Sequence, residues 1–222
     1  MSVPQKHLQH LYLRAGFGIM PAEIKEKLPL SRNKLVQQVF TASETNQPLQ
    51  YLRNPVKGKE VGDLRILLMM LSSQKQMEEL DVQWLNKLAE TTAMLREKMT
   101  LFWHTHFATS TQFAWLMQVQ NNTLRTHALG SFRNLLHAVA KDPAMIIYLN
   151  NQQNKKDAPN ENFAREVMEL FTLGEGNIYT EKDIKESARA FTGWTVNRKG
   201  EFEFSEQDHD GGVKDFMGRS GH

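Results

Sequence analysis

The stretch that most constrains the fold runs from residue 160 to residue 174, where helix start and stop signals enclose one amphipathic pattern. Pro159 cannot continue a helix from the preceding residues, and Asn160 is a favoured N-cap residue. Gly174 is typical of the position just after a helix C-terminus. These signals predict a helix of about four turns between Asn160 and Gly174.

This predicted helix has an apolar arc and a polar arc when residues are placed about 100° apart. The apolar arc is expected to be buried and contains Phe163, Ala164, Val167, Met168, Leu170 and Phe171. The polar arc contains Glu161, Asn162, Arg165, Glu166 and Glu169. The spacing also predicts two i,i+4 ion pairs, Glu161–Arg165 and Arg165–Glu169.

The polar arc allows two interpretations. One is a solvated helix face, whose surface ion pairs contribute about 0.3–0.5 kcal/mol each and need no function. The other is a binding or catalytic site, because asparagines flank Glu161 on both sides. In addition, Glu166 and Glu169 are three residues apart, so both could reach one cation.

Composition limits the kinds of site and partner. The chain has 222 residues, no cysteine and a net charge of +2, from 27 basic and 25 acidic residues. This balance gives no general attraction to nucleic acid or to an anionic membrane. Without cysteine there is no disulfide and no thiolate metal site, so a metal ion would need His, Asp, Glu or carbonyl ligands.

Neither a targeting segment nor a membrane span is evident. The N-terminus lacks a basic region followed by an apolar run, so we expect a cytoplasmic protein without a secretory signal. The richest apolar run, residues 64–71, is much shorter than the roughly 18 residues that a membrane-spanning helix needs.

Helical periodicity recurs along most of the chain, which predicts a mainly α protein with an irregular multi-helix bundle in a single domain over residues 1–222. Residues 41–62 contain prolines, glycines and many polar residues, and we expect a long loop or flap there. Residues 62–80 are expected to form one helix, and residues 81–107 one long helix or two in tandem. The alternation in residues 201–204 predicts at most one short strand or hairpin near residues 200–205.

Two local signals predict further helix starts. Asp142 precedes Pro143 and is expected to cap a short helix over residues 143–148. Thr180, with Asp183 three residues later, forms an imperfect capping box at the start of another helix. No helix closes the chain at His222, and we expect a protein that is truncated at its C-terminus.

Potential metal ligands also lie outside the central helix. His104 and His106 are two residues apart, and on a regular helix such residues point about 200° apart. Both could bind one ion only if the backbone became extended there; otherwise His106 is a core residue and His104 an exposed or paired one. His209 and Asp210 precede two glycines, where they could bind a cation or form a solvated turn.

Several blocks occur in order along the chain. They read RAGFG (residues 14–18), LREKM (95–99), FWHTHFATS (102–110), PNENFAREVMELFTLG (159–174), YTEKD (179–183), ARAFTGW (188–194) and HDG (209–211). Together these blocks resemble the bacterial family known as domain of unknown function 1800. The resemblance spans nearly the whole chain.

The resemblance implies a mainly helical fold of bacterial origin. Family members usually continue well beyond residue 222, which implies that this chain is an N-terminal portion of a longer protein. Many members are exported, and many are encoded beside an uncharacterised, sulfatase-like family, so a sulfatase-like protein is an expected partner. The family has no established activity, so the resemblance supplies no catalytic residues.

The first functional hypothesis is an enzyme with a divalent metal ion held between helices, most simply a hydrolase. Its ligands would be drawn from His104, His106, Glu166, Glu169, His209 and Asp210. Glu161 would act as a general base or orient a ligand, and Arg165 would bind an anion.

The alternative is a non-enzymatic helical module that binds a partner protein or a polysaccharide. The same polar residues would then form a structural network that holds the helices in one arrangement. Exposed aromatic residues near a groove, such as Trp115 or Trp194, would favour this alternative. A nucleic-acid binder is a third and weaker hypothesis, because no basic stripe is interleaved with aromatic residues.

Overall fold

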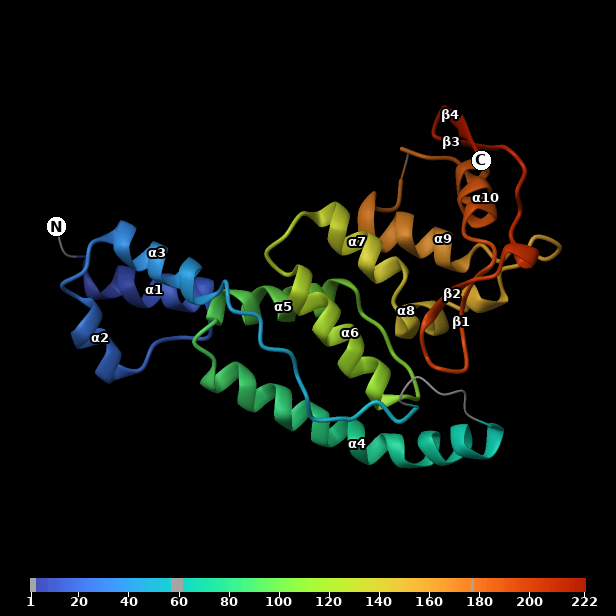
Figure 1. Cartoon of the computed structure of the whole chain (residues 1–222). Coiled ribbons are helices and arrows are strands. Elements are labelled where there is room, and N and C mark those ends of the chain that lie inside the picture. Colours follow the sequence, from blue (N-terminus) through green and yellow to red (C-terminus); the bar gives the residue numbers. More distant parts are fainter. Residues whose placement is uncertain (1–2, 57–61, 177) are drawn as a thin grey trace.

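The computed structural model describes residues 3–56, 62–176 and 178–222. These residues form a mainly helical protein with helices α1 to α10 and four short strands. Figure 1 shows the N-terminal helices α1 to α3 at one end, α4 to α8 in the middle, and α9, α10 and the strands at the other end. The predicted fold class is confirmed.

The N-terminal helices form a small core of their own. They are α1 (Gln5–Ala15), α2 (Pro21–Lys27) and α3 (Arg32–Ala42). Their buried residues are Leu8, Tyr12, Ile24, Leu35 and Val39. Gly16 lets the end of α1 approach the start of α5, because a Cβ at Gly16 would lie 2.9 Å from the Cβ of Met94.

The segment between α3 and α4 has no helix or strand in its described residues, 43–56, and this part is held against α6 by side-chain amides. Asn122 accepts a hydrogen bond from Leu49 N at 2.7 Å and donates one to Leu49 O at 2.9 Å. Gln118 pairs with both main-chain groups of Leu52 in the same way, at 2.8 Å each. The remainder of the predicted loop includes residues 57–61, which lie outside the described part.

Two helices follow, and the boundary between them differs from the prediction. Helix α4 (Asp63–Glu90) has 28 residues and α5 (Met94–His106) has 13. The break therefore lies at residues 91–93 rather than near residue 80. Thr91 has extended backbone angles and its Oγ1 accepts a hydrogen bond from Ala93 N at 3.1 Å, which ends α4.

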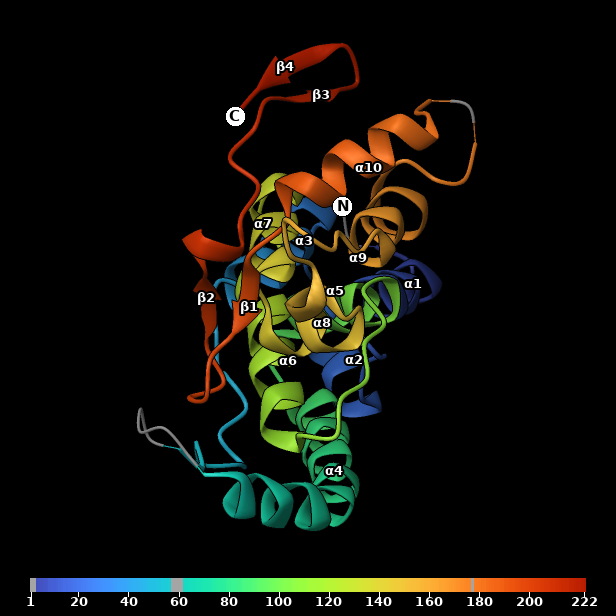
Figure 2. The same cartoon turned by 90° about the vertical axis from the view of Figure 1, so that its right-hand side faces the viewer.

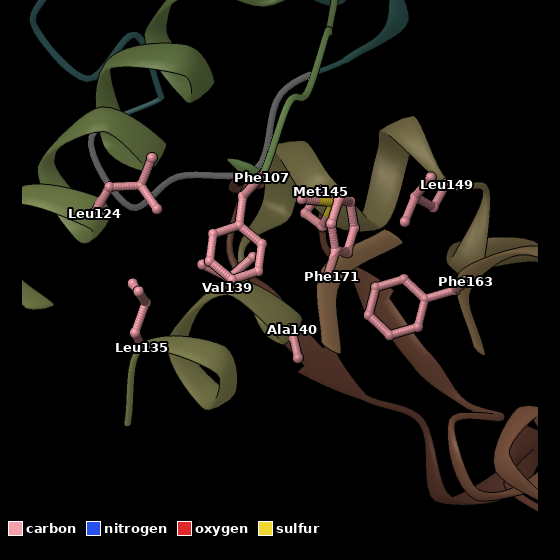
Figure 3. Close-up of a cluster of buried hydrophobic side chains, with 9 residues drawn as sticks. All are labelled: Phe107, Leu124, Leu135, Val139, Ala140, Met145, Leu149, Phe163 and Phe171. Atoms are coloured by element: carbon pink, nitrogen blue, oxygen red, sulfur yellow. The ribbon is translucent and has the colours of Figure 1, made fainter. Parts of the chain in front are cut away.

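The main core lies where α5 to α9 meet. The helices α6 (Ala114–His127), α7 (Phe132–Ala140) and α8 (Pro143–Tyr148) supply most of it. Figure 3 shows Phe107, Val139, Met145 and Phe171 gathered at its centre. Its buried members are Phe107, Leu124, Leu135, Val139, Ala140, Met145, Leu149, Phe163 and Phe171.

The C-terminal part contains the remaining helices and two separate antiparallel strand pairs (Figure 2). The helices are α9 (Asn162–Glu166), which continues as the π-helix η2 (Val167–Thr172), and α10 (Glu181–Ala190). The strand pairs are β1 (Trp194–Val196) with β2 (Phe202–Phe204), and β3 (Lys214–Phe216) with β4 (Arg219–Gly221). The β1–β2 pair is the predicted hairpin, whereas the β3–β4 pair was not expected.

The predicted helix starts are confirmed. Asp142 Oδ1 accepts hydrogen bonds from Ala144 N at 3.0 Å and Met145 N at 3.2 Å, and α8 covers the predicted residues. Thr180 and Asp183 form a complete capping box at the start of α10. Among the described residues, no helix combines the length and the apolar composition that crossing a membrane requires.

Candidate functional site

The central helix starts slightly later than predicted and changes its geometry part-way. Asn160 Oδ1 accepts a hydrogen bond from Asn162 N at 2.9 Å, and Asn162 is the first helical residue. From Val167 the helix becomes a π-helix, in which Leu173 N donates to Met168 O at 2.8 Å. Gly174 follows with φ +80°, a left-handed conformation that suits glycine.

The π-helix overturns one prediction about the apolar arc. Leu170 was expected to be buried, but 64% of its surface is exposed. A π turn takes up one more residue than an α turn, so residues after Val167 rotate away from α-helical spacing. Met168 and Phe171 are still buried, so the π-helix exposes Leu170 to solvent and keeps these two residues in the core.

Arg165 is the centre of a carboxylate cluster, which we call the Arg165 cluster. Its Nη2 is 3.1 Å from Glu161 Oε2 and its Nη1 is 3.2 Å from Glu169 Oε1, which confirms both predicted i,i+4 pairs. Glu181, at the start of α10, adds a two-pronged contact at 3.0 and 2.8 Å. The contact with Arg165 lowers the pKa of the Glu181 carboxyl, and Glu181 is the main cause of a raised Arg165 pKa. Both terminal nitrogens of Arg165 are thus already occupied by carboxylates.

Glu166 differs from the other acidic residues of this helix. It is half-buried, and within the described ranges it makes no ion pair and no side-chain hydrogen bond. It immediately precedes the π-helix, and short π segments are frequent at functional sites. Of the predicted central-helix ligands, Glu166 is therefore the one that no arginine in the described residues neutralises.

A second arginine forms the Arg189 cluster with Glu186 and Asp210. Arg189 donates from Nε to Asp210 Oδ2 at 2.7 Å and from Nη2 to Asp210 Oδ1 at 3.2 Å. Its Nη1 contacts both oxygens of Glu186, at 3.0 and 2.8 Å. The hydrogen bonds from Arg189, together with the one that Gly212 N donates, lower the pKa of the Asp210 carboxyl to about 2. Asp210 therefore ties the segment after η3 (Glu206–Asp208) to α10.

His209 joins the same region by its ring. Its Nδ1 lies 2.8 Å from Thr192 O, and its ring meets the Phe204 ring edge-on with centroids 5.1 Å apart. Gly193 makes this packing feasible, because a Cβ there would overlap the carbonyl oxygen of Ser205. His209 and Asp210 are thus joined to α10 and the first hairpin by these contacts.

His106 is surrounded by aromatic rings at the end of α5. Its Nε2 lies 3.0 Å from Phe171 O in the π-helix, so the Nε2–H group donates a hydrogen bond to that carbonyl. The rings of Phe102, Trp103 and Phe107 are its other neighbours. His106 is thus a half-buried histidine with one hydrogen-bond partner and aromatic neighbours.

His104 faces a different helix. Its ring meets the Trp84 ring of α4 edge-on, with centroids 4.8 Å apart. Its Nδ1 is buried and has no hydrogen-bond partner among the described residues. Burial lowers the pKa of His104, and Asp81 partly opposes that effect. The two histidines therefore diverge, as regular helical spacing predicts.

The predicted metal ligands are consequently not brought together. His104 lies between α4 and α5, His106 beside the π-helix, and Asp210 against α10. In the part of the chain that the structure describes, no group of three or more His, Asp or Glu side chains could hold a metal ion.

A protein-family model described as "Protein of unknown function (DUF1800)" matches residues 10–222. The chain belongs to the DUF1800 family. No curated protein and no solved structure matches the chain. The matched residues include all predicted site residues and both arginine clusters.

Three features of this DUF1800 chain were missed by sequence reasoning. Glu97 and Arg125 are both buried and form a close ion pair. Asp142 was predicted only as a cap, but burial also raises the pKa of its carboxyl to about 7. Arg189 was noted only within a block that resembles the family. Glu97 also lies within such a block, whereas Arg125 lies in none of them, so no sequence signal indicated the Glu97–Arg125 pair.

Proposed function

We propose that this DUF1800 chain is a non-enzymatic helical module that binds a partner protein through the outer face of α4. The two arginine clusters support the non-enzymatic part, because their arginines already bind carboxylates that a catalytic site would need free. The single observation that carries the proposal is the apolar surface that α4 presents to solvent.

Helix α4 is mostly exposed along its 28 residues, and only Ser73 and Leu80 are buried. Leu64 and Leu71 are each 73% exposed. Figure 1 places α4 along one edge of the molecule, with α5 and α6 on one side of it only. The outer face of α4 consists of Leu64, Leu67, Leu68, Leu71, Val82 and Leu85, all more than half exposed.

This exposed face lies opposite the side of α4 that packs on the protein. Ser73 Oγ accepts a hydrogen bond from Ala114 N at 2.7 Å, and Trp84 contacts His104, so these residues mark the inner side. At about 100° per residue, Leu64 and Leu71 lie on the far side of the helix from them, and Leu85 lies at the edge of that side. A helix that is apolar on two opposite sides has a second surface to bury, and such exposed patches are typical of protein-binding sites.

The side chains of the outer face favour a protein over a polysaccharide. They are leucines and a valine, which pack well against another apolar protein surface. The two tryptophans that would favour a polysaccharide are half-buried: Trp194 packs against Phe191 and Phe202, and Trp115 lies over Gly200. The sulfatase-like protein expected from the family resemblance is one partner to test.

Cysteine labelling tests this proposal without knowledge of the partner, because the chain has no cysteine of its own. Leu68→Cys places a thiol on the outer face, and Gln83→Cys places a control thiol on the exposed flank of the same helix. We expect a membrane-permeant maleimide in intact cells to label the Leu68→Cys variant much more slowly than the Gln83→Cys variant. The dilute purified variants should react equally fast. Equal labelling in cells would contradict the proposal.

A metal-assisted reaction is the second candidate function. It is favoured by Glu166, which has no arginine partner in the described residues and precedes a π-helix whose Phe171 carbonyl contacts His106. In this candidate His106 and Glu166 are the first residues to test as ligands, and Glu161 and Arg165 as acid–base and anion-binding residues. The metal content of the purified protein distinguishes the two candidates.

A further inference from the structure

We propose that the occupant of the outer face of α4 is a second copy of this chain, and that the two α4 helices pack antiparallel about a twofold axis. This inference rests on the proposed function, since it names the partner of the same surface. It is carried by the spacing of the apolar residues, by two charged residues at the centre, and by where those charges lie along the helix.

The outer side of α4 carries a heptad pattern. Positions 64, 68, 71, 75, 78, 82, 85 and 89 are separated alternately by four and three residues, and all are exposed. This is the spacing of the seam along which two helices of a coiled coil meet. We call these positions the α4 seam; its apolar members are Leu64, Leu68, Leu71, Val82, Leu85 and Ala89.

The two remaining seam positions carry opposite charges. Lys75 has a side chain that is 84% exposed, with its Nζ 3.8 Å from Glu79 Oε1. Glu78 makes no ion pair within the described ranges and is exposed. Charged residues in a helix seam cost stability unless they meet an opposite charge, so Lys75 and Glu78 limit how a second helix can pack.

The place of these charges along α4 indicates the register. Helix α4 runs from Asp63 to Glu90, so its midpoint lies between residues 76 and 77. The midpoint between Lys75 and Glu78 is the same point. Two α4 helices that overlap over their whole length in opposite directions therefore place Lys75 beside Glu78 of the partner subunit, twice.

The same register also pairs the apolar positions. Leu71 meets Val82 of the partner subunit, Leu68 meets Leu85 of the partner subunit, and Leu64 meets Ala89 of the partner subunit. A leucine or valine cluster thus lies on each side of the central charge pairs. Every seam residue faces a complementary one, as a twofold-symmetric interface requires.

A parallel arrangement is disfavoured by the same residues. In register, it would place Lys75 against Lys75 of the partner subunit and Glu78 against Glu78 of the partner subunit. Like charges at a helix interface are repulsive, so the central pair selects the antiparallel orientation. Antiparallel helix dipoles also attract each other modestly.

The seam is accessible along its length. Helix α4 is about 42 Å long, and Figure 2 shows it at the edge of the molecule, with no other described helix or strand on its outer side. Helices in contact lie about 8–10 Å apart, so a second α4 can approach without displacing α5 or α6.

Charge reversal tests the register. We expect the wild-type chain to dimerise in sedimentation velocity at about 100 µM, and Lys75→Glu or Glu78→Lys alone to weaken dimerisation at least about tenfold. The double variant Lys75→Glu/Glu78→Lys should restore the dimer. An equimolar mixture of the two single variants should form a heterodimer, because opposite charges meet again. The control Lys25→Glu, on the exposed side of α2, should dimerise like the wild type.

Disulfide trapping tests the orientation independently of charge. Positions 64 and 89 lie about 38 Å apart along one helix, so Leu64→Cys alone cannot cross-link to itself in the antiparallel dimer. A mixture of Leu64→Cys and Ala89→Cys chains should cross-link under mild oxidation. Cross-linking of Leu64→Cys with itself, without that of the mixture, would overturn the antiparallel arrangement.

Sedimentation of the wild-type chain tests the dimer, and cysteine labelling in cells tests the proposed function separately. A wild-type chain that stays monomeric at about 100 µM has no such dimer. If the Leu68→Cys thiol is still protected in cells, a different protein covers the face and the proposed function stands. If that thiol is labelled freely in cells, the proposed function fails as well. Single charge variants that dimerise like the wild type would overturn the register.

Discussion

Arg125 and Glu97 form a two-pronged ion pair that is shielded from solvent, with Nε–Oε1 at 2.7 Å and Nη2–Oε2 at 3.0 Å. The pair links α6 to α5. Arg125 Nη1 also donates to Asn122 Oδ1 at 2.8 Å, and Asn122 holds the main chain of Leu49. Lys87 of α4 lies 4.0 Å from Glu97. One buried ion pair thus connects three helices and the segment before α4.

Breaking this pair should destabilise the protein strongly. Arg125→Met leaves the Glu97 carboxylate buried without its main partner, and we expect the free energy of unfolding to fall by about 3–5 kcal/mol. The double variant Glu97→Leu/Arg125→Met removes both charges and should recover most of that loss. Urea unfolding followed by circular dichroism measures both changes. A double variant as unstable as the single one would show that the pair itself stabilises the fold.

Asp142 should make stability depend on pH. Burial raises the pKa of its carboxyl from the ordinary 3.8 to about 7, although Ala144 and Met145 donate hydrogen bonds that act in the opposite direction. Because the folded state binds this proton more tightly than the unfolded state, the contribution is favourable below pH 4. It is lost as the pH rises through about 7.

The matched variant for this test is Asp142→Asn, which keeps a good N-cap residue but cannot ionise. Between pH 5 and pH 8 we expect the wild type to lose about 2–3 kcal/mol of unfolding free energy relative to the variant. Urea titrations at several pH values provide the comparison. Parallel pH profiles for the two proteins would mean that Asp142 ionises as it does in water.

Two glycines with similar backbone angles should respond differently to the same substitution. Gly193 has φ +77° and Gly174 has φ +80°, a region that other residues adopt at a cost. A Cβ at Gly193 would also overlap the Ser205 carbonyl, whereas a Cβ at Gly174 would meet nothing within 4 Å. Gly174→Ala should therefore cost about 1 kcal/mol of unfolding free energy, and Gly193→Ala clearly more. Equal losses would contradict the close packing at Gly193.

The metal content of the protein should distinguish the two candidate functions. For the protein-binding module we expect far less than one metal ion per chain, by mass spectrometry, after incubation with zinc, manganese or calcium and desalting. The comparison is the double variant His106→Ala/Glu166→Ala. Near-stoichiometric metal that is lost in a folded double variant would instead support the metal-assisted reaction.

Features that depend on neighbouring residues in the sequence were predictable. The Asp142 cap, the Thr180–Asp183 capping box and the Arg165 pairs with Glu161 and Glu169 all lie within one helical turn or its end. Helical geometry alone determines such contacts. The divergence of the two histidines on α5 follows from the same geometry.

Contacts between distant segments were not predictable in this way. Glu181 joins the Arg165 cluster from another helix, and Asp210 meets Arg189 across 21 residues. The π-helix that exposes Leu170 was also missed. Its extra residue per turn is tolerated because Met168 and Phe171 remain in the core and His106 binds the Phe171 carbonyl.

The sequence by itself determined that residues 63–90 and 94–106 are helical, although not that the break between the two helices falls at residues 91–93. Only the tertiary structure decided which sides are buried: Glu97 lies in the interior, whereas Leu64 and Leu71 remain in contact with solvent. Hydrophobicity alone would suggest the opposite. Burial depends on what the rest of the chain brings against a helix face, and α6 brings Arg125 against α5 while no described element covers the outer face of α4.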